Sequence, residues 1–108
     1  MPNLSKDQAF ILRAACRIKT YPEHLSFGPH YMLIGVSGKM IESARRLELR
    51  GLLRHMEDQP DRTIFIGTDA GARMMGMQTL QEFADEAARA RSLVGVVAGL
   101  TDTDEFED

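Results

Sequence analysis

The sequence predicts a mainly α fold with one small β-hairpin. Apolar residues recur at helical spacing within residues 6–19, 38–50 and about 69–100. Two short extended runs flank a Pro/Asp turn at residues 57–61, which indicates a single hairpin. The 108 residues suffice for one domain, which we place at residues 1–100; the acidic stretch 101–108 that follows is expected to be disordered.

The first helix is expected over residues 6–19. Ser5 precedes it and Gln8 occupies its third position, which together form a capping-box pattern. Its apolar residues, Phe10 among them, cover most of the circumference, so we expect two neighbours, one of which could be a second subunit. Tyr21-Pro22 ends the helix, because the residue before a proline avoids the helical backbone conformation.

A second, shorter helix is predicted at residues 29–34, because Gly28-Pro29 places a proline at the favoured first helical position. A tight turn follows. Ser37 is then expected to cap a third helix at residues 38–50, which stops at Gly51.

The third helix has an apolar stripe on one side (Met40, Ala44, Leu47) and a basic, polar stripe on the other, with Leu49 as an outward-pointing exception. The net charge of the chain is −3. Leaving out the five acids of residues 101–108 leaves 13 bases against 11 acids, so the body carries +2. Residues 39–54 hold five bases and two acids, and this local excess matters most for phosphate binding.

The hairpin and a last helix complete the chain. Residues 52–56 and 62–66 are predicted to form the two strands. Thr68-Asp69 offers an N-cap and a first-turn acid for a helix over residues 69–100, with a break near Gly76.

This order of elements is that of a winged helix-turn-helix, and four short motifs resemble the MarR family of bacterial transcription regulators. Ile34-Gly35-Val36-Ser37 is similar to the family's turn before its recognition helix, and Leu47-Glu48-Leu49-Arg50-Gly51-Leu52-Leu53 to the end of that helix. Asp61-Arg62 is similar to the tip of its wing, and Gly67-Thr68-Asp69-Ala70-Gly71 to the exit of the wing. PadR-like and other small winged-helix regulators remain alternatives.

The resemblance implies a cytoplasmic, dimeric transcription regulator that binds double-stranded DNA. Residues 37–46 would enter the major groove, while Arg62 would enter the minor groove with Asp61 orienting it. The DNA-binding candidates are Ser37, Lys39, Glu42, Ser43, Arg45, Arg46, Arg50, Asp61 and Arg62.

The long last helix is the predicted dimerisation element, because Gly95 and Gly99 stand four residues apart and would let two helices approach closely. A helix that only closes the core of its own subunit is the alternative. The dimerisation candidates are Phe10, Leu80, Phe83, Ala87, Val94, Gly95 and Ala98. A small-molecule effector between the DNA-binding and dimerisation parts is a further candidate partner.

No sequence pattern indicates an enzyme, a metal site or a cofactor. The three histidines lack metal-ligand spacing, and Cys16, without a second cysteine, is expected to be a packed core thiol. No apolar run approaches the roughly twenty residues of a membrane span, and a cytoplasmic location is expected. The alternative function is a protein–protein interaction module in which the basic helix or the acidic stretch engages a partner protein.

Overall fold

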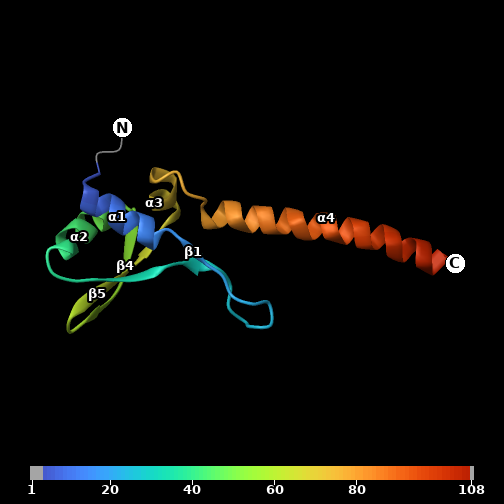
Figure 1. The fold of residues 1–108 in the computed structure, drawn as a ribbon, viewed down its shortest axis with the longest axis horizontal. Coiled ribbons are helices and arrows are strands. Elements are labelled where there is room, and N and C mark those ends of the chain that lie inside the picture. Colours follow the sequence, from blue (N-terminus) through green and yellow to red (C-terminus); the bar gives the residue numbers. More distant parts are fainter. Residues whose placement is uncertain (1–3, 108) are drawn as a thin grey trace.

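The computed structural model describes the backbone of residues 4–107 and the side chains of residues 4–93. A mixed α/β body carries one long helix that extends away from it, and the molecule measures 68 × 35 × 17 Å (Figure 1). The elements in chain order are α1 (Lys6–Ala15), β1 (Ile18–Lys19), β2 (His30–Tyr31), β3 (Leu33–Val36), α2 (Met40–Leu49), β4 (Leu53–Gln59), β5 (Arg62–Gly67), α3 (Asp69–Met74) and α4 (Leu80–Glu107).

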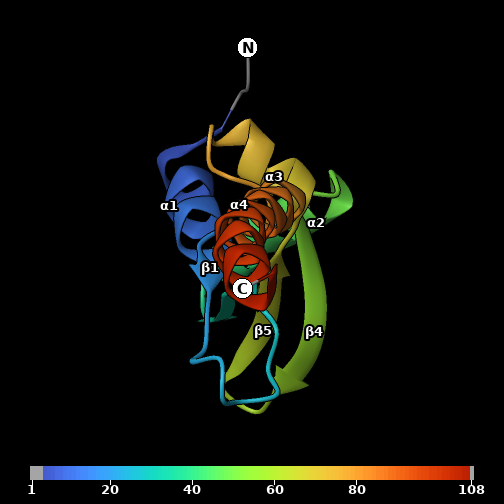
Figure 2. The ribbon, with the colours of Figure 1, turned by 90° about the vertical axis from the view of Figure 1, so that its right-hand side faces the viewer.

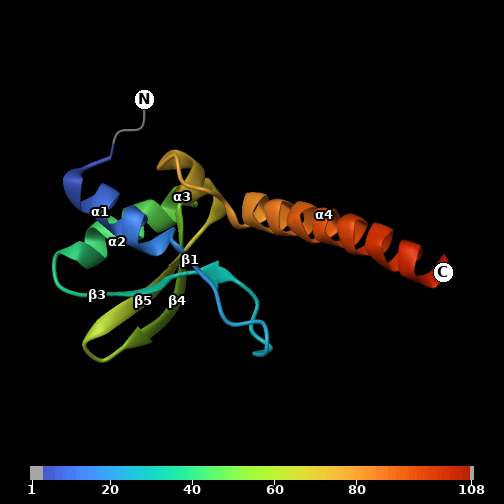
Figure 3. The same ribbon diagram turned by 45° about the vertical axis from the view of Figure 1, so that its right-hand side comes forward.

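Two small antiparallel sheets organise the body. One has three strands in the order β3-β5-β4, and the other pairs β1 with β2. Along the central strand β5, Thr63, Phe65 and Gly67 are buried in alternation with more exposed residues, so one face of this sheet points into the core. Helices α1 and α2 pack on that face, and Figure 3 shows the sheet below them.

The predicted mainly α winged helix-turn-helix is wrong. Residues 29–34, predicted as the second helix, are extended and contribute to β2 and β3. Strands therefore separate α1 from α2, and in the described part of the chain no helix directly precedes α2 to form a helix-turn-helix pair. The physical reason is pairing with a distant strand: Ile34 lies opposite Phe65, and Val36 lies opposite Thr63. This pairing outweighs the local preference of a proline for a helix start.

The core lies between the three-stranded sheet and the helices. Leu12 of α1, Leu47 of α2 and Phe65 of β5 are fully buried within it. The capping box at the start of α1 is confirmed, since the Gln8 N–H donates to Ser5 Oγ and the Ser5 N–H donates to Gln8 Oε1. Helix α1 ends at Ala15, earlier than predicted, because the next residues enter β1.

The predicted N-cap at Thr68 and the break near Gly76 are both confirmed. Thr68 Oγ1 accepts from the Gly71 N–H, and Gly76 has a φ of +67°, which closes α3 with a left-handed residue. Helix α4 then runs to Glu107 and includes residues 101–107, for which composition predicts disorder. None of the helices in the described part of the chain is both long enough and apolar enough to cross a bilayer.

Candidate nucleic-acid interface

Helix α2 is held rigidly on the body by its buried side and its C-terminal cap. Ala44 and Leu47 are fully buried. Gly51 adopts a φ of +76°. The Leu52 N–H donates to the Leu47 carbonyl at 2.9 Å, and the Gly51 N–H donates to the Glu48 carbonyl at 2.9 Å. This is a Schellman motif, in which the buried Leu47 and Leu52 provide the usual apolar contact. The orientation of the basic helix is therefore fixed by the core.

The start of α2 differs from the prediction. Ser37 does not cap the helix: Lys39 occupies the N-cap position with a helical backbone, and no side chain caps it. The turn is made by Gly38, whose φ is +60°. Helix α2 therefore begins at Met40, two residues later than expected, and Ser37 lies before that turn.

The outward face of α2 carries most of its charge. Arg46 Nη2 lies 2.8 Å from Glu42 Oε1, but both side chains are largely exposed. An exposed i,i+4 ion pair contributes only about 0.3–0.5 kcal/mol, so a phosphate group can compete for this arginine. The exposed residues of the helix and its two ends are Lys39, Glu42, Arg45, Arg46, Leu49 and Arg50, four bases with one acid.

Arg45 connects α2 to the β4–β5 hairpin. Its Nη2 lies 3.9 Å from Asp58 Oδ1 on β4. The same carboxylate is hydrogen-bonded to His55 Nε2 at 3.1 Å. This hydrogen bond, and to a smaller extent one from Thr63, lowers the pKa of Asp58 below its ordinary value. Asp58 therefore stays ionised near neutral pH and moderates the positive charge at this side of the helix.

A shallow polar depression of about 550 Å³ lies between α2 and the first turn of α1. It brings four of the predicted DNA-binding residues together: Lys39, Glu42, Ser43 and Arg46. Ser5, Asp7 and Gln8 of α1 complete its lining. The sequence motifs did not indicate that α1 adjoins the basic face, because this proximity arises only from the packing of α1 against α2.

The structure separates Arg62 from the basic face of α2. Arg62 alternates with the buried Thr63 of β5, so its side chain lies on the sheet face opposite the helices. There it lies along Gly35 of β3, where a Cβ atom would meet Arg62 Cδ. Its Nε donates to Gln59 Oε1 at 2.9 Å, so Gln59 takes the orienting role that the sequence assigned to Asp61.

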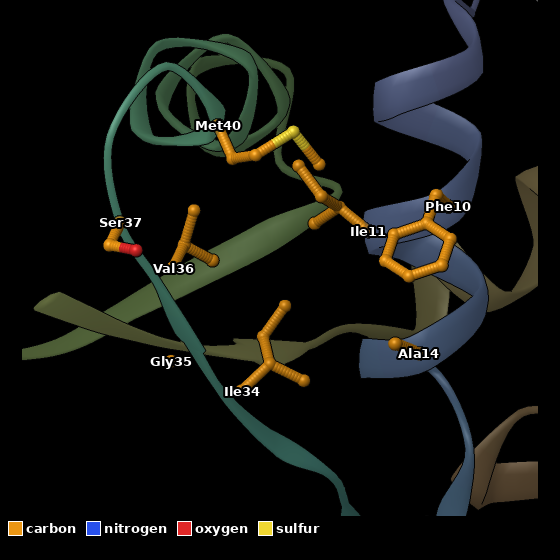
Figure 4. A pocket seen from close by; sticks show the side chains of 8 residues that line it. All are labelled: Phe10, Ile11, Ala14, Ile34, Gly35, Val36, Ser37 and Met40. Carbon is orange, nitrogen blue, oxygen red and sulfur yellow. The ribbon is translucent and has the colours of Figure 1, made fainter.

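An apolar groove of about 410 Å³ separates α1 from β3 and the start of α2 (Figure 4). Phe10 and Ala14 line it from α1, Ile34 and Val36 from β3, and Met40 from α2. The groove is wide enough for a small apolar molecule.

The dimerisation candidates occupy different environments. Phe10 is 67% exposed, whereas Leu80 packs against the core of its own subunit. Phe83 and Ala87 are half-buried, and the other described side chains of α4 beyond Leu80 are exposed. The side chains of Val94, Gly95 and Ala98 lie outside the described residues.

Neither a metal-ligand cluster nor a reactive thiol stands out among the described side chains. Among them, no three His, Cys, Asp or Glu residues lie close enough to hold a metal ion. Cys16 is 1% exposed, and burial raises the pKa of its thiol, as expected for a packed core residue.

Comparison with protein-family models, with curated proteins and with solved structures finds no match. The resemblance to MarR regulators therefore depends on the four short motifs quoted above.

Proposed function

We propose that this protein binds double-stranded DNA as a homodimer and regulates transcription, with the outward face of α2 as its contact surface. The observation that carries the proposal is the rigid basic face of α2, where Lys39, Arg45, Arg46 and Arg50 are exposed and one acid, Glu42, stands among them. A helix about 10–12 Å across fits the major groove, where arginine side chains read guanine and bind phosphates.

Dimerisation is part of the proposal because α4 has little support from its own subunit. It extends from the body with most of its described side chains exposed (Figure 1). Helices in proteins derive most of their stability from packing of one face, so a second copy would stabilise α4. Two α2 helices presented about 34 Å apart would match successive major grooves of a palindromic site.

Fluorescence anisotropy with a labelled duplex tests the DNA contact. Affinity should fall by roughly tenfold or more between about 50 and 200 mM salt, because binding releases counterions. Lys39→Ala and Arg46→Ala should each weaken binding, while Arg89→Ala, which removes an exposed arginine from α4, is the matched control. Undetectable binding at low salt, or equal affinity in all three variants, would show that α2 is not a DNA-binding surface.

A small-molecule effector is a second element of the proposal, and the apolar groove favours it. Met40, the first residue of α2, lines the groove together with Ile34 of β3. An apolar ligand there would contact the start of the DNA-binding helix directly. Ala14→Leu, which fills the groove from α1, should abolish binding of an apolar fluorescent probe and leave the DNA affinity of the free protein unchanged.

Protein binding by α2 is the alternative function, and Leu49 favours it. This side chain is 87% exposed on the same face as Arg45 and Arg46. Leu49→Ser separates the two functions: it should leave duplex affinity within about twofold if phosphates are the target, because it removes no charge.

A further inference from the structure

The β1–β2 hairpin forms an arm that extends from the same end of the body as α4 (Figures 1 and 2). Residues 22–29 of its loop are all exposed, and Leu25 and Phe27 are 39% and 64% accessible to solvent. Figure 2, a view nearly along α4, shows the arm to one side of the helix axis. The arm thus presents apolar side chains at the end of the body from which α4 leaves, and the described side chains of α4 beyond Leu80 are mostly exposed.

The arm is built around Tyr21. The rings of Tyr21 and Phe27 have centroids 5.2 Å apart, and the Tyr21 hydroxyl is 2.7 Å from His30 Nε2. His30 Nδ1 lies 2.6 Å from the Tyr31 carbonyl, so with Nδ1 protonated the ring donates there and accepts from Tyr21. Lys19 Nζ lies 5.6 Å from the centroid of the Tyr21 ring. These contacts hold Phe27 in place at the surface.

The base of the arm is positively charged. Arg13 lies in the last turn of α1, Arg17 follows the end of that helix, and Lys19 lies on β1. All three are exposed, and none of them forms an ion pair with another described residue. A shallow groove of about 280 Å³ lies between these arginines and Phe10. The surface therefore fits an acidic segment that also carries an aromatic side chain.

Residues 101–108 of this chain have that chemistry, with five acids, no base and one aromatic residue, Phe106. Helix α4 is continuous from Leu80 to beyond Asp102. These 22 residues of helix place Asp102 about 33 Å from Leu80. The acidic stretch therefore cannot reach the arm of its own subunit. In a twofold dimer with antiparallel α4 helices, however, the end of one α4 comes to the body of the other subunit.

We infer that the arm together with its basic base, residues 13–27, binds the acidic stretch 101–108 of a second copy of this chain. The cationic side chains pair with the carboxylates, and Phe27 offers a stacking surface for the partner's Phe106. The inference rests on the homodimer of the proposed function and adds to it an interface between elements that were not expected to meet.

Charge reversal with rescue tests the pairing, with the dimer dissociation constant measured by sedimentation equilibrium. Arg17→Glu with Lys19→Glu should weaken the dimer about tenfold or more. Asp102→Lys with Asp104→Lys should do the same, and the four changes together should restore the affinity. Lys6→Glu with Arg54→Glu changes the net charge by the same amount as the Arg17→Glu, Lys19→Glu variant, but at other exposed sites. It should have little effect on the dimer dissociation constant. Circular dichroism verifies that each variant is folded.

Disulfide trapping gives a second measurement that does not depend on charge. Phe27→Cys in one tagged copy and Phe106→Cys in a differently tagged copy should form a mixed disulfide, while unaltered copies, whose Cys16 is buried, should not. The inference is overturned if no mixed disulfide forms and the Arg17→Glu, Lys19→Glu variant is as dimeric as its control. That result would leave the homodimer intact. A monomeric wild type overturns both, while DNA contact by α2 is judged separately by anisotropy.

Discussion

The hydroxyl of Tyr31 donates a hydrogen bond to the carboxylate of Asp69, and this pair fixes the first residue of α4. The Leu80 N–H donates to the Tyr31 hydroxyl at 2.8 Å and to Asp69 Oδ1 at 3.2 Å. Thr79 caps the same helix, with its Oγ1 accepting from the Glu82 N–H. Strand β2 and helix α3 thereby set the direction in which α4 leaves the body.

Removal of the Tyr31 hydroxyl should destabilise the protein. Tyr31→Phe deletes one donor and one acceptor at a site that is 4% exposed, which should lower the free energy of unfolding by about 1–3 kcal/mol. Urea denaturation measures this effect. Tyr21→Phe, which changes the exposed arm, should cost less; equal losses in both variants would mean that the Tyr31 network does not anchor α4.

The Tyr31 phenol should resist ionisation in the folded protein. Burial, and next the hydrogen bond to Asp69, raises the pKa of Tyr31 far above its ordinary value of about 10. The protonated Tyr31 phenol contributes fully to the free energy of unfolding below pH 10. This contribution is lost as the pH rises above 10, because the tyrosine of the unfolded chain ionises first. In the Tyr21→Phe variant Tyr31 is the only tyrosine. Its phenolate absorbance should be absent near pH 11 in buffer and present in urea.

Gly67→Ala should be strongly destabilising. A Cβ atom at Gly67 would collide with the Ala15 carbonyl, where α1 crosses the end of β5. Such overpacking costs typically about 1–3 kcal/mol, and backbone atoms cannot move aside as side chains do. Gly28→Ala is the matched control, because no atom lies within 4 Å of the added carbon. Thermal unfolding should show a large decrease in Tm for the first variant alone.

Cys16 should be chemically inert in the folded state. Burial raises the pKa of its thiol, which lowers the thiolate fraction, and the side chain has almost no access to solvent. A thiol reagent at mildly alkaline pH should therefore react at the rate of unfolding, and rapidly in denaturant. Fast modification of the native protein would identify an accessible thiol and contradict the packing of α1.

Arg62→Ala should weaken DNA binding less than Arg46→Ala does. Arg62 lies along Gly35 on the sheet face opposite α2, so the two arginines point to different surfaces. We expect less than about a twofold change in duplex affinity for the first and a much larger one for the second. An equal loss in the two variants would place the hairpin on the DNA and require the duplex to contact both faces.

Some local signals in the sequence predicted element ends correctly, although the cap expected at Ser37 does not form. The caps at Ser5 and Thr68 and the left-handed glycines 51 and 76 involve partners within a few residues, so composition nearby is enough to identify them. Long-range pairing was not predictable in this way. The extended conformation near Ile34 depends on Phe65, which is distant in the sequence.

The candidate site was predictable in part. The spacing of Ala44 and Leu47 correctly identified the buried side of α2, and therefore its basic side. The direction of Arg62 was not predictable, because a one-residue change in strand register moves a side chain to the other face of a sheet. The position of α1 beside Lys39 likewise depends on tertiary packing rather than on any motif.

The projection of α4 has a hydrodynamic consequence. The radius of gyration is 19.2 Å, whereas a compact domain of about 100 residues has about 13 Å. A single copy with this shape will experience high friction and elute from a sizing column at the volume of a considerably heavier globular protein. Subunit number in solution must therefore be obtained from light scattering or sedimentation equilibrium, which report mass independently of shape.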